Sequence, residues 1–319
     1  MTRMYPSGQA ASAEYAFHTW LMSYMTGFGE VNPVLAAAGL METSSTPTRK
    51  YHVPIPPLGI SDIVDGDEAE DGKEWPAKGI QSSEIEGACR PRGIAGLEMT
   101  EDDLLETKVP VVSANMTALG RQEKLFEDKM GARALELGVT TTTASDGKLI
   151  FAVDHYIDPV AKTGKQSNSY KGGISPDKVL EIIAGFRALK TEGGDPVYPE
   201  EAQFTLVAPP ALQPDAERSL DREYVAEAVG AAAAASVKNV SYKRAGLVIL
   251  PQVVDPQRWF VAATNLPRKA IARILFRALM RFQLGPESDL WKSKRKMKVY
   301  ANEKSDYRLV DWRLIATSK

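Results

Sequence analysis

The chain has 319 residues, of which 44% are hydrophobic and 25% are charged, a balance typical of ordinary globular proteins. Its 39 basic and 41 acidic side chains give a net charge of −2, which is too balanced for a general nucleic-acid binder and favours self-association. This length predicts two compact domains.

The single cysteine, Cys89, excludes a disulfide within the chain and indicates a reducing compartment such as a bacterial cytosol. The first residues contain no apolar core of a secretory signal. No apolar run reaches the ~20 residues that a membrane span needs. We therefore expect neither a signal peptide nor a membrane segment.

Residues 1–50 show no clear period, although the stretch YAFHTWLMSYMTGF is aromatic and rich in methionine. Such a stretch packs either on the chain's own core or on a neighbour, and we favour an extended arm with apolar anchors. Residues 51–105, rich in proline and glycine, predict a long two-stranded excursion. Its tip holds seven acids and one lysine between Ser61 and Trp75, and a solvated loop is the simpler interpretation.

Apolar spacing predicts a helix over 113–138, with Ser113 or Asn115 as its cap and Gly138 as its stop. Two glycines inside it indicate that one face approaches another backbone closely. These glycines are Gly120 and Gly131. Glycine inside a helix lowers the stability of that helix, so its presence calls for a compensating contact.

A second helix should start at Ser175, because Ser is a good cap and Pro176 fits the first helical position. The segment QFTLVAPP predicts a buried strand, and a helix is expected from Pro214 to Tyr224. Two short strands should flank the turn at Asp255-Pro256. The apolar face of the second helix comprises Val179, Ile182, Ile183, Phe186 and Leu189.

Residues 267–283 alternate arginines and apolar residues at spacings that fit a helix. On this pattern Arg273, Arg277 and Arg281 share one face. The chain should end in an antiparallel pair, 298–301 and 307–316, around the turn NEKSD.

The sequence contains none of the common motifs for phosphate binding, serine hydrolysis or multi-cysteine zinc binding. It has no phosphate-binding glycine loop, no G-x-S-x-G elbow and too few cysteines for a multi-cysteine zinc site. The three histidines lie far apart. We therefore predict no catalytic residue, no cofactor and no metal.

The stretch SDGKLIFAVDHY contains the pair Asp154-His155, which resembles a catalytic dyad. Adjacent strand residues point to opposite faces and no nucleophile motif accompanies them, so a hydrogen-bonded structural histidine is the preferred interpretation. Asp146-Gly147 is typical of a tight turn, followed by the strand KLIFAV.

The stretch WKSKRKMK concentrates five cations near the C-terminus. It could contact phosphates or an acidic protein surface, and a solvated strand edge protected by lysines explains it equally well. The five cations are Lys292, Lys294, Arg295, Lys296 and Lys298.

Six segments identify a family resemblance through their order along the chain, although each of them alone is a weak motif. They are MTEDDLLE (99–106), DGKLIFAVDH (146–155), SPDKVLEIIAGFRALKTEGGDPV (175–197), FTLVAPPALQPDAERSL (204–220), AGLVILPQVVDPQRWFVAAT (245–264) and YRLVDWRLI (307–315). In this order the chain resembles the major capsid (head) proteins of Mu-like tailed bacteriophages.

The resemblance implies an α+β protein with the HK97-type capsid fold. It implies an N-terminal arm over 1–50, an extended loop over 51–105 and a peripheral domain over 106–199 with a spine helix at 113–138. It also implies an axial domain over 200–285 and return strands over 286–319. For 268–283 it favours strand over the helical pattern, and the alanine-rich VGAAAAASVKN (229–239) could be a helix or an axial loop.

By the same resemblance, the chain is a structural protein and not an enzyme. It would form hexamers and pentamers of an icosahedral virion that encloses double-stranded DNA, assembled in the host cytoplasm. Expected partners are its own copies, a separate scaffold protein, a portal, a decoration protein and non-specifically contacted DNA. Another virion protein of the tail or decoration class is the alternative, and a hydrolase using Asp154 and His155 is a more distant one.

We hypothesise that the acidic tip, Asp62 to Glu74, docks on a basic surface of another subunit. The candidate contact residues are Asp67, Glu68 and Asp71 on the tip, and Arg273, Arg277, Arg281, Lys292, Lys294, Arg295 and Lys296 on the receiving surface.

Overall fold

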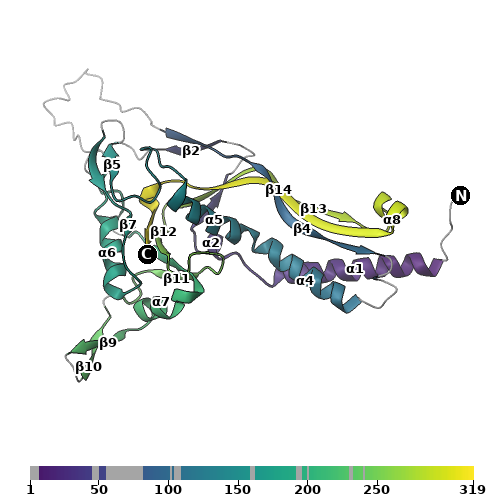
Figure 1. Ribbon diagram of the computed structural model, residues 1–319, viewed down its shortest axis with the longest axis horizontal. Coiled ribbons are helices and arrows are strands. Elements are labelled where there is room, and N and C mark those ends of the chain that lie inside the picture. Colours follow the sequence, from purple (N-terminus) through teal and green to yellow (C-terminus); the bar gives the residue numbers. More distant parts are fainter. Residues whose placement is uncertain are drawn as a thin grey trace, which may run out of the picture. The chain divides into compact units, whose positions relative to one another are not determined.

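The fold was analysed in a computed structural model (Figure 1). It describes residues 7–44, 50–54, 82–100, 103, 109–158, 162–191, 196–199, 201–229, 233–239 and 241–319. The chain divides into two compact units. Unit 1 takes in Met1–Pro33, Ala88–Lys129 and Leu275–Asp306, and unit 2 takes in Val34–Gly87, Met130–Ile274 and Tyr307–Lys319.

Unit 1 combines two long helices with long strands (Figure 1). Its elements are α1 (Ser7–Gly29), β4 (Arg90–Thr100), α4 (Val109–Lys124), α8 (Asp289–Lys294), most of β13 (Ile271–Leu284) and most of β14 (Lys296–Leu309). Strand β14 lies between β13 and β4 and pairs antiparallel with β4. The helices and strands share one apolar core, formed by Ala16, Trp20, Tyr24, Met99, Val112, Met116, Met297 and Val299.

Helices α1 and α4 lie side by side at very short range. A Cβ atom added to Gly120 would sit 2.1 Å from the carbonyl oxygen of Tyr24, and one on Gly27 would sit 2.0 Å from that of Thr117. The Thr117 hydroxyl also donates to the carbonyl oxygen of Ser23 at 3.2 Å. The predicted backbone approach at Gly120 is therefore confirmed, and α1 supplies that backbone. At Gly131 the prediction is wrong, because a Cβ there would meet the side chain of Leu35 at 2.4 Å and not a backbone.

The N-terminal segment is a helix packed on its own chain, so the prediction of an extended arm is wrong for the described residues. Trp20 and Tyr24 are buried against α4, whereas Tyr15 and Met22 are exposed. Apolar side chains on both sides of the helix hide the 3.6-residue period that would otherwise reveal it.

Unit 2 is built around a five-stranded mixed sheet, in the order β11-β8-β12-β15-β7. These strands are β7 (Ser169–Tyr170), β8 (Phe204–Ala208), β11 (Gly246–Ile249), β12 (Trp259–Ala263) and β15 (Ile315–Ser318). The helices of this unit are α2 (Val34–Ala37), most of α5 (Phe126–Thr140), α6 (Pro176–Arg187), α7 (Gln213–Leu220) and the 3-10 turns η1 (Pro210–Leu212) and η2 (Trp312–Leu314).

Both faces of this sheet are covered, which is why β8 and β12 are buried along their whole length. On one face Phe204 stacks on Phe186 of α6, with ring centroids 5.3 Å apart. On the other, Phe260 meets Phe151 at 5.6 Å. The second predicted helix and its Ser175 cap are confirmed, since the Ser175 hydroxyl accepts from the backbone N–H of Lys178.

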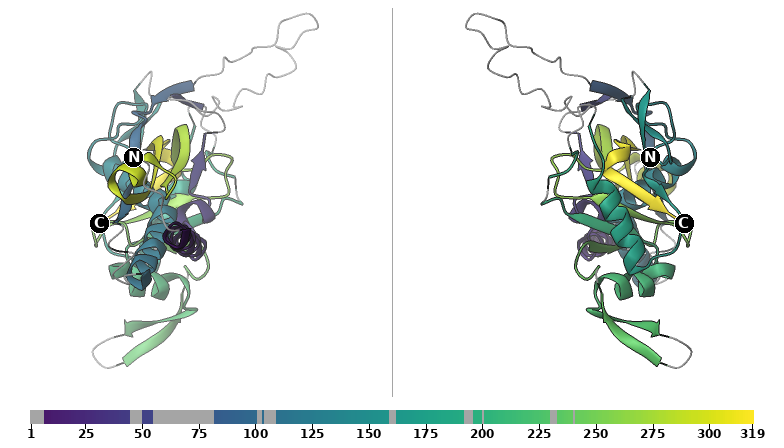
Figure 2. Two further views of the ribbon diagram at one scale, coloured as in Figure 1. Left: turned by 90° about the vertical axis from the view of Figure 1, so that its right-hand side faces the viewer. Right: turned by 90° about the vertical axis from the view of Figure 1, so that its left-hand side faces the viewer.

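Shorter strands form hairpins and one parallel pair at the edges of unit 2. They are β1 (Met41–Thr43), β2 (Lys50–Pro54), β3 (Ser82–Glu86), β5 (His155–Asp158), β6 (Thr163–Gln166), β9 (Tyr224–Val229) and β10 (Ala233–Lys238). Strands β2 and β3 pair antiparallel, as do β5 with β6 and β9 with β10. The β9–β10 hairpin, built from the alanine-rich segment, projects away from the sheet (Figures 1 and 2).

The predicted helix at 113–138 is present as α4 and α5, separated only by Leu125. The predicted ends were wrong. The helix starts at Val109, since proline is tolerated in a first turn, and Ser113 and Asn115 are interior. It also runs past Gly138, where a Cβ would clash with Leu309 and Phe151. The expected helix from Pro214 to Tyr224 likewise ends earlier, at Leu220.

The helix expected at 267–283 is the strand β13. The two C-terminal strands expected around NEKSD are joined in the single strand β14, which ends at Leu309, and the rest of the second one is divided between η2 and β15. A spacing of four residues keeps side chains on one face of a strand as well as of a helix. In β14 the expected turn pairs with β4, with Asn302 opposite Gly93 and Ser305 opposite Arg90.

The α1–α4 contact can be tested with a single methyl group. Gly120→Ala should lower the free energy of unfolding of unit 1 by about 1–3 kcal/mol, because the added Cβ collides with the backbone of α1. Gly29→Ala is the matched control, since no atom lies within 4 Å of its Cβ position, and it should change stability by less than about 0.5 kcal/mol. Urea unfolding followed by circular dichroism measures both, and equal effects would contradict the close contact.

Candidate functional site: assembly surfaces and a basic pocket

The predicted contact residues fall into three groups, of which the acidic one, Asp67, Glu68 and Asp71, lies outside the described residues. The arginines of β13 already have partners within the chain. Arg277 donates to the Asn302 side chain at 2.7 Å, and the Arg273 guanidinium lies 5.9 Å from the Tyr307 ring centre.

Arg281 is paired with a buried carboxylate. Its Nε lies 2.7 Å from Oε1 of Glu123, whose side chain is almost fully buried. Burial raises the pKa of Glu123, and the Arg281 guanidinium opposes that rise. The main contact of Arg281 is therefore inside unit 1, and a role at a subunit interface stays a prediction.

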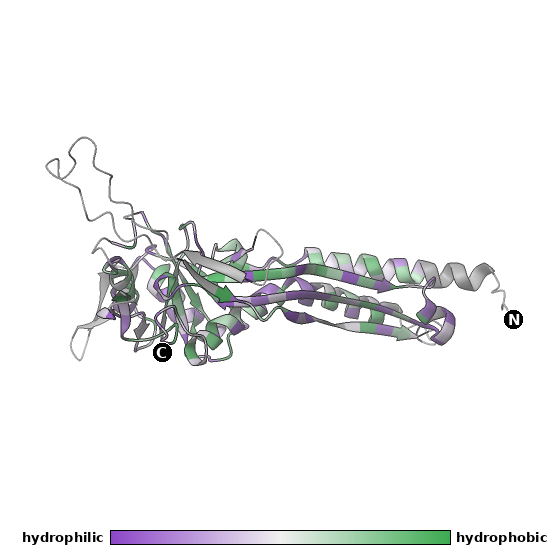
Figure 3. Cartoon of the chain, turned by 90° about the horizontal axis from the view of Figure 1, so that it is seen from above, coloured by the Kyte–Doolittle hydropathy of each residue, from purple (hydrophilic) through white to green (hydrophobic). Residues whose placement is uncertain are grey.

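The lysine-rich stretch starts in α8, where hydrophilic residues gather (Figure 3). Lys292 and Lys294 are exposed. Lys296 pairs with Glu98 at 2.5 Å and lowers the pKa of that carboxyl. Arg295 adopts a positive φ of 56° between α8 and β14. This surface is solvated and cationic, as either sequence interpretation requires.

His155 is fully buried and held on three sides. Its Nδ1 lies 2.8 Å from Oδ2 of Asp146, its Nε2 lies 3.1 Å from the carbonyl oxygen of Ile150, and its ring stacks on Trp312 at 4.2 Å. The expected structural, hydrogen-bonded histidine is confirmed.

The partner of His155 is Asp146, nine residues earlier, and not Asp154. Asp154 instead pairs with Lys148 at 2.6 Å, and that ion pair lowers the pKa of the Asp154 carboxyl. The Asp146-Gly147 turn is confirmed, with Gly147 at φ +78°. The strand predicted for KLIFAV is wrong, because the next strand, β5, starts only at His155.

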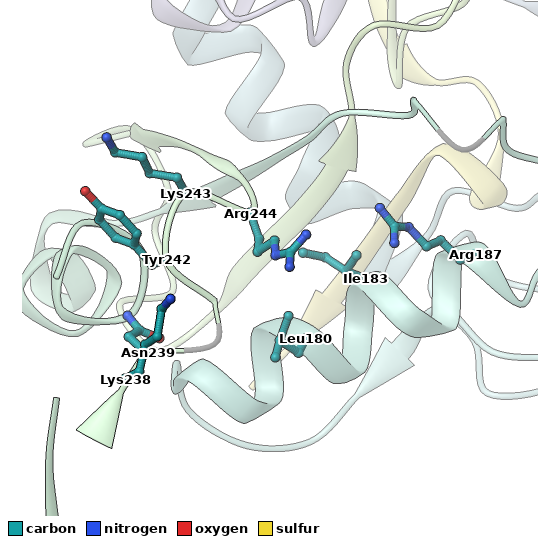
Figure 4. A pocket seen from close by; sticks show the side chains of 8 residues that line it. All are labelled: Leu180, Ile183, Arg187, Lys238, Asn239, Tyr242, Lys243 and Arg244. Carbon is teal, nitrogen blue, oxygen red and sulfur yellow. The ribbon is translucent and has the colours of Figure 1, made fainter. Parts of the chain in front are cut away.

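A pocket of about 730 Å³ lies in unit 2, between α6 and the turn that follows β10 (Figure 4). Leu180 and Ile183 of α6 give it an apolar wall. Arg187 and Arg244 extend from opposite sides of Ile183 (Figure 4). Its lining residues are Leu180, Ile183, Arg187, Lys238, Asn239, Tyr242, Lys243 and Arg244.

Sequence analysis did not single out this pocket. The signal was the run KNVSYKR at 238–244, but its partner Arg187 is far away in the sequence. Asn239 fixes the turn, because its side-chain amide donates to the carbonyl oxygens of Ser219 and Arg222 at 2.8 and 2.7 Å. The cations of the turn are thereby held beside α6.

A second surface candidate is apolar. Tyr15, Met22 and Met25 follow one side of α1 at helical spacing and are 77%, 60% and 44% exposed. On β13, Phe276 and Met280 are 37% and 43% exposed. Helix α1 has thus buried one face on α4 and still presents large apolar side chains to solvent.

The described residues contain no group of three or more His, Cys, Asp or Glu side chains placed to hold a metal ion. Among the described helices, none combines the length and hydropathy of a bilayer span.

Residues 94–314, more than two thirds of the chain, match the family model described as phage capsid protein. The chain belongs to the phage capsid protein family. No curated protein matches the sequence of this capsid protein.

Solved structures show the fold of this capsid protein. The virus-like particle from Pyrococcus furiosus is 10% identical, with 95% of this chain and 99% of that chain covered and a TM-score of 0.50. The capsid of cyanophage P-SCSP1u is also 10% identical, with 88% and 86% covered and a TM-score of 0.50. The expected α+β, HK97-type capsid fold is confirmed. The narrower resemblance to Mu-like phages stays a prediction.

The buried histidine of this capsid protein gives a stability test. His155→Ala should lower the free energy of unfolding by about 2–4 kcal/mol, because it opens a cavity beside Trp312 and removes the side-chain partner of the Asp146 carboxylate, which keeps only the backbone N–H groups of Lys148 and Tyr156. Asp154→Asn removes only a part-exposed ion pair, so its denaturation midpoint should hardly change. A larger effect at Asp154, measured by urea denaturation, would overturn the assignment of Asp146 as the partner.

Proposed function

We propose that this capsid protein assembles into the hexamers and pentamers of an icosahedral phage head that encloses double-stranded DNA. The observation that carries the proposal is the apolar stripe of α1, Tyr15, Met22 and Met25, in a chain of the phage capsid family. Large apolar groups in one exposed row are typical of protein–protein contact surfaces. Copies of the same chain are the partners available in a shell.

The exposed apolar stripe of α1 has the fixed geometry that a contact repeated between identical copies needs. It lies on a helix whose other face is fixed on α4 through glycine contacts, so its geometry is preorganised for docking. Stable interfaces bury about 1,200–2,000 Å² in total, more than one stripe supplies. The proposal therefore needs further contacts, for which the β2–β3 and β9–β10 hairpins are suited.

The division into arm, extended loop, peripheral domain and axial domain is part of this proposal. Helix α1 corresponds to the arm, the β2–β3 hairpin to the stem of the extended loop, and α4 with α5 to the spine helix. The projecting β9–β10 hairpin is suited to meet its copies around a capsomer axis (Figure 2). Residues 286–319 contribute to both units, through β14 and β15.

The proposed role requires burial of surface between subunits and control of the curvature of the shell, and it involves no chemical reaction. The shell would form in the host cytoplasm with a separate scaffold protein and a portal, and decoration proteins and non-specific DNA contacts would complete the virion. A tail or decoration protein would instead form tubes, rings or trimers, which distinguishes it by particle shape.

Sedimentation velocity tests the proposal. After co-expression with its scaffold protein, the wild-type chain should sediment mainly as large closed particles, and the double variant Met22→Ser, Met25→Ser should remain as capsomers or monomers. Burying one methionine side chain stabilises a contact by about 1.5–3 kcal/mol. The variant loses this contribution at two side chains in every copy, so the assembly equilibrium should shift strongly toward free subunits.

Gln122→Ser is the matched control, at an exposed position on α4 of the same unit, and it should assemble normally. Circular dichroism checks that each variant is folded. Normal particles from the double methionine variant would contradict the role of the stripe, and a wild type that stays monomeric under assembly conditions would contradict the proposed function.

A further inference from the structure

The basic pocket of unit 2 brings together four cations and no anion. Arg187 comes from α6, Lys238 from the end of β10, and Lys243 and Arg244 from the turn that follows (Figure 4). Among the described residues, none of the four forms an ion pair, although Lys243 lies over the Tyr242 ring at 5.0 Å. All four cations are exposed to solvent, so water and salt screen their mutual repulsion, but their summed field still attracts an anion to the concavity.

We propose that this pocket binds the acidic segment Asp62–Glu74 of a second copy of the chain. The inference rests on the proposed self-assembly and names the contact that the pocket makes in it. It differs from the receiving surfaces predicted from sequence. Of those, Arg281 is engaged with Glu123 and Arg277 with Asn302 inside unit 1, whereas Lys292 and Lys294 of α8 stay exposed and are the competing surface.

Charge favours this occupant. The segment from Ser61 to Trp75 carries seven acids and one lysine, the strongest concentration of negative charge in the sequence. Complementary potentials of this kind fix the register of two protein surfaces and suppress wrong partners.

The pocket's apolar wall favours a peptide over a nucleic acid. Ile183 is buried and Leu180 half-buried, and the aromatic ring of Tyr242 is also part of the lining. The acidic segment includes Ile63 and Val64, which can cover such a wall. A nucleic acid contacts a cationic surface mainly through its phosphates, which would leave the apolar wall of the pocket uncovered.

The hairpin stem makes the segment available to a neighbour. Strands β2 and β3 hold Pro54 opposite Ser82, and residues 55–81 connect them. Half of that connection, fully extended, spans roughly 45 Å. The β2–β3 hairpin and the β9–β10 hairpin, whose end lines the pocket, lie on opposite sides of unit 2 (Figures 1 and 2). This placement favours a second copy over the same chain.

Photo-crosslinking in assembled particles locates the occupant directly. Tyr242 is replaced by benzoylphenylalanine, and unlabelled copies carrying the probe are co-assembled with ¹⁵N-labelled copies without it. Mass spectrometry should find the probe joined to ¹⁵N-labelled peptides from 61–75. If the probe at Tyr242 prevents assembly, it is placed at Lys243 instead. Crosslinks to packaged nucleic acid, to another protein segment, or only within one copy would each overturn the proposal.

Charge reversal supplies an independent test. Reversing the pocket (Arg187→Glu, Arg244→Glu) or the segment (Asp67→Lys, Glu68→Lys, Asp71→Lys) should each reduce particle yield about tenfold. Combining both should restore most of the yield. The matched control, Lys292→Glu with Lys294→Glu on α8, should neither reduce the yield alone nor rescue the segment variant.

The outcomes separate this inference from the proposed function. If wild-type chains form shells and both reversals also form shells at normal yield, the pocket contact is wrong and the capsid role stands. If wild-type chains co-expressed with the scaffold protein form no shells, the capsid role itself fails. Thermal melting of each variant confirms that a lost yield does not come from unfolding.

Discussion

The close contact of α1 with α4 is the constraint on which the rest of the structure depends. Glycine at positions 27 and 120 lets the two backbones nearly touch, and Trp20 and Tyr24 are buried beneath them. With one face fixed in this way, α1 must present its remaining apolar side chains, Met22 among them, to solvent. Large apolar side chains on a helix are normally buried, and in the single chain Tyr15, Met22 and Met25 of α1 are not.

Assembly is the role that we propose for the apolar face that α1 leaves exposed. Unit 1 offers the apolar stripe, and unit 2 offers a cationic pocket and two hairpins that project from a well-covered sheet. The apolar contact supplies affinity, and the charged contact supplies register. A net charge of −2 lets identical copies pack edge to edge without strong mutual repulsion.

Sequence reasoning predicted well where a local rule decides the structure, as in the cap of α6 at Ser175 and the turn at Gly147. It failed where tertiary context decides. The four-residue arginine spacing in β13 fits strand and helix alike, and the pairing with β4 carries β14 through an expected turn. The basic pocket was missed because Arg187 joins its other cations only in the folded chain. The family resemblance came from the order of segments, which the family match then confirmed.

Cryo-electron microscopy of the particles formed by the purified chain tests the central claim most directly. The account predicts closed icosahedral shells of pentamers and hexamers, with Tyr15, Met22 and Met25 buried against a neighbouring copy. Open tubes or rings, or closed shells in which this stripe of α1 still faces solvent, would contradict it.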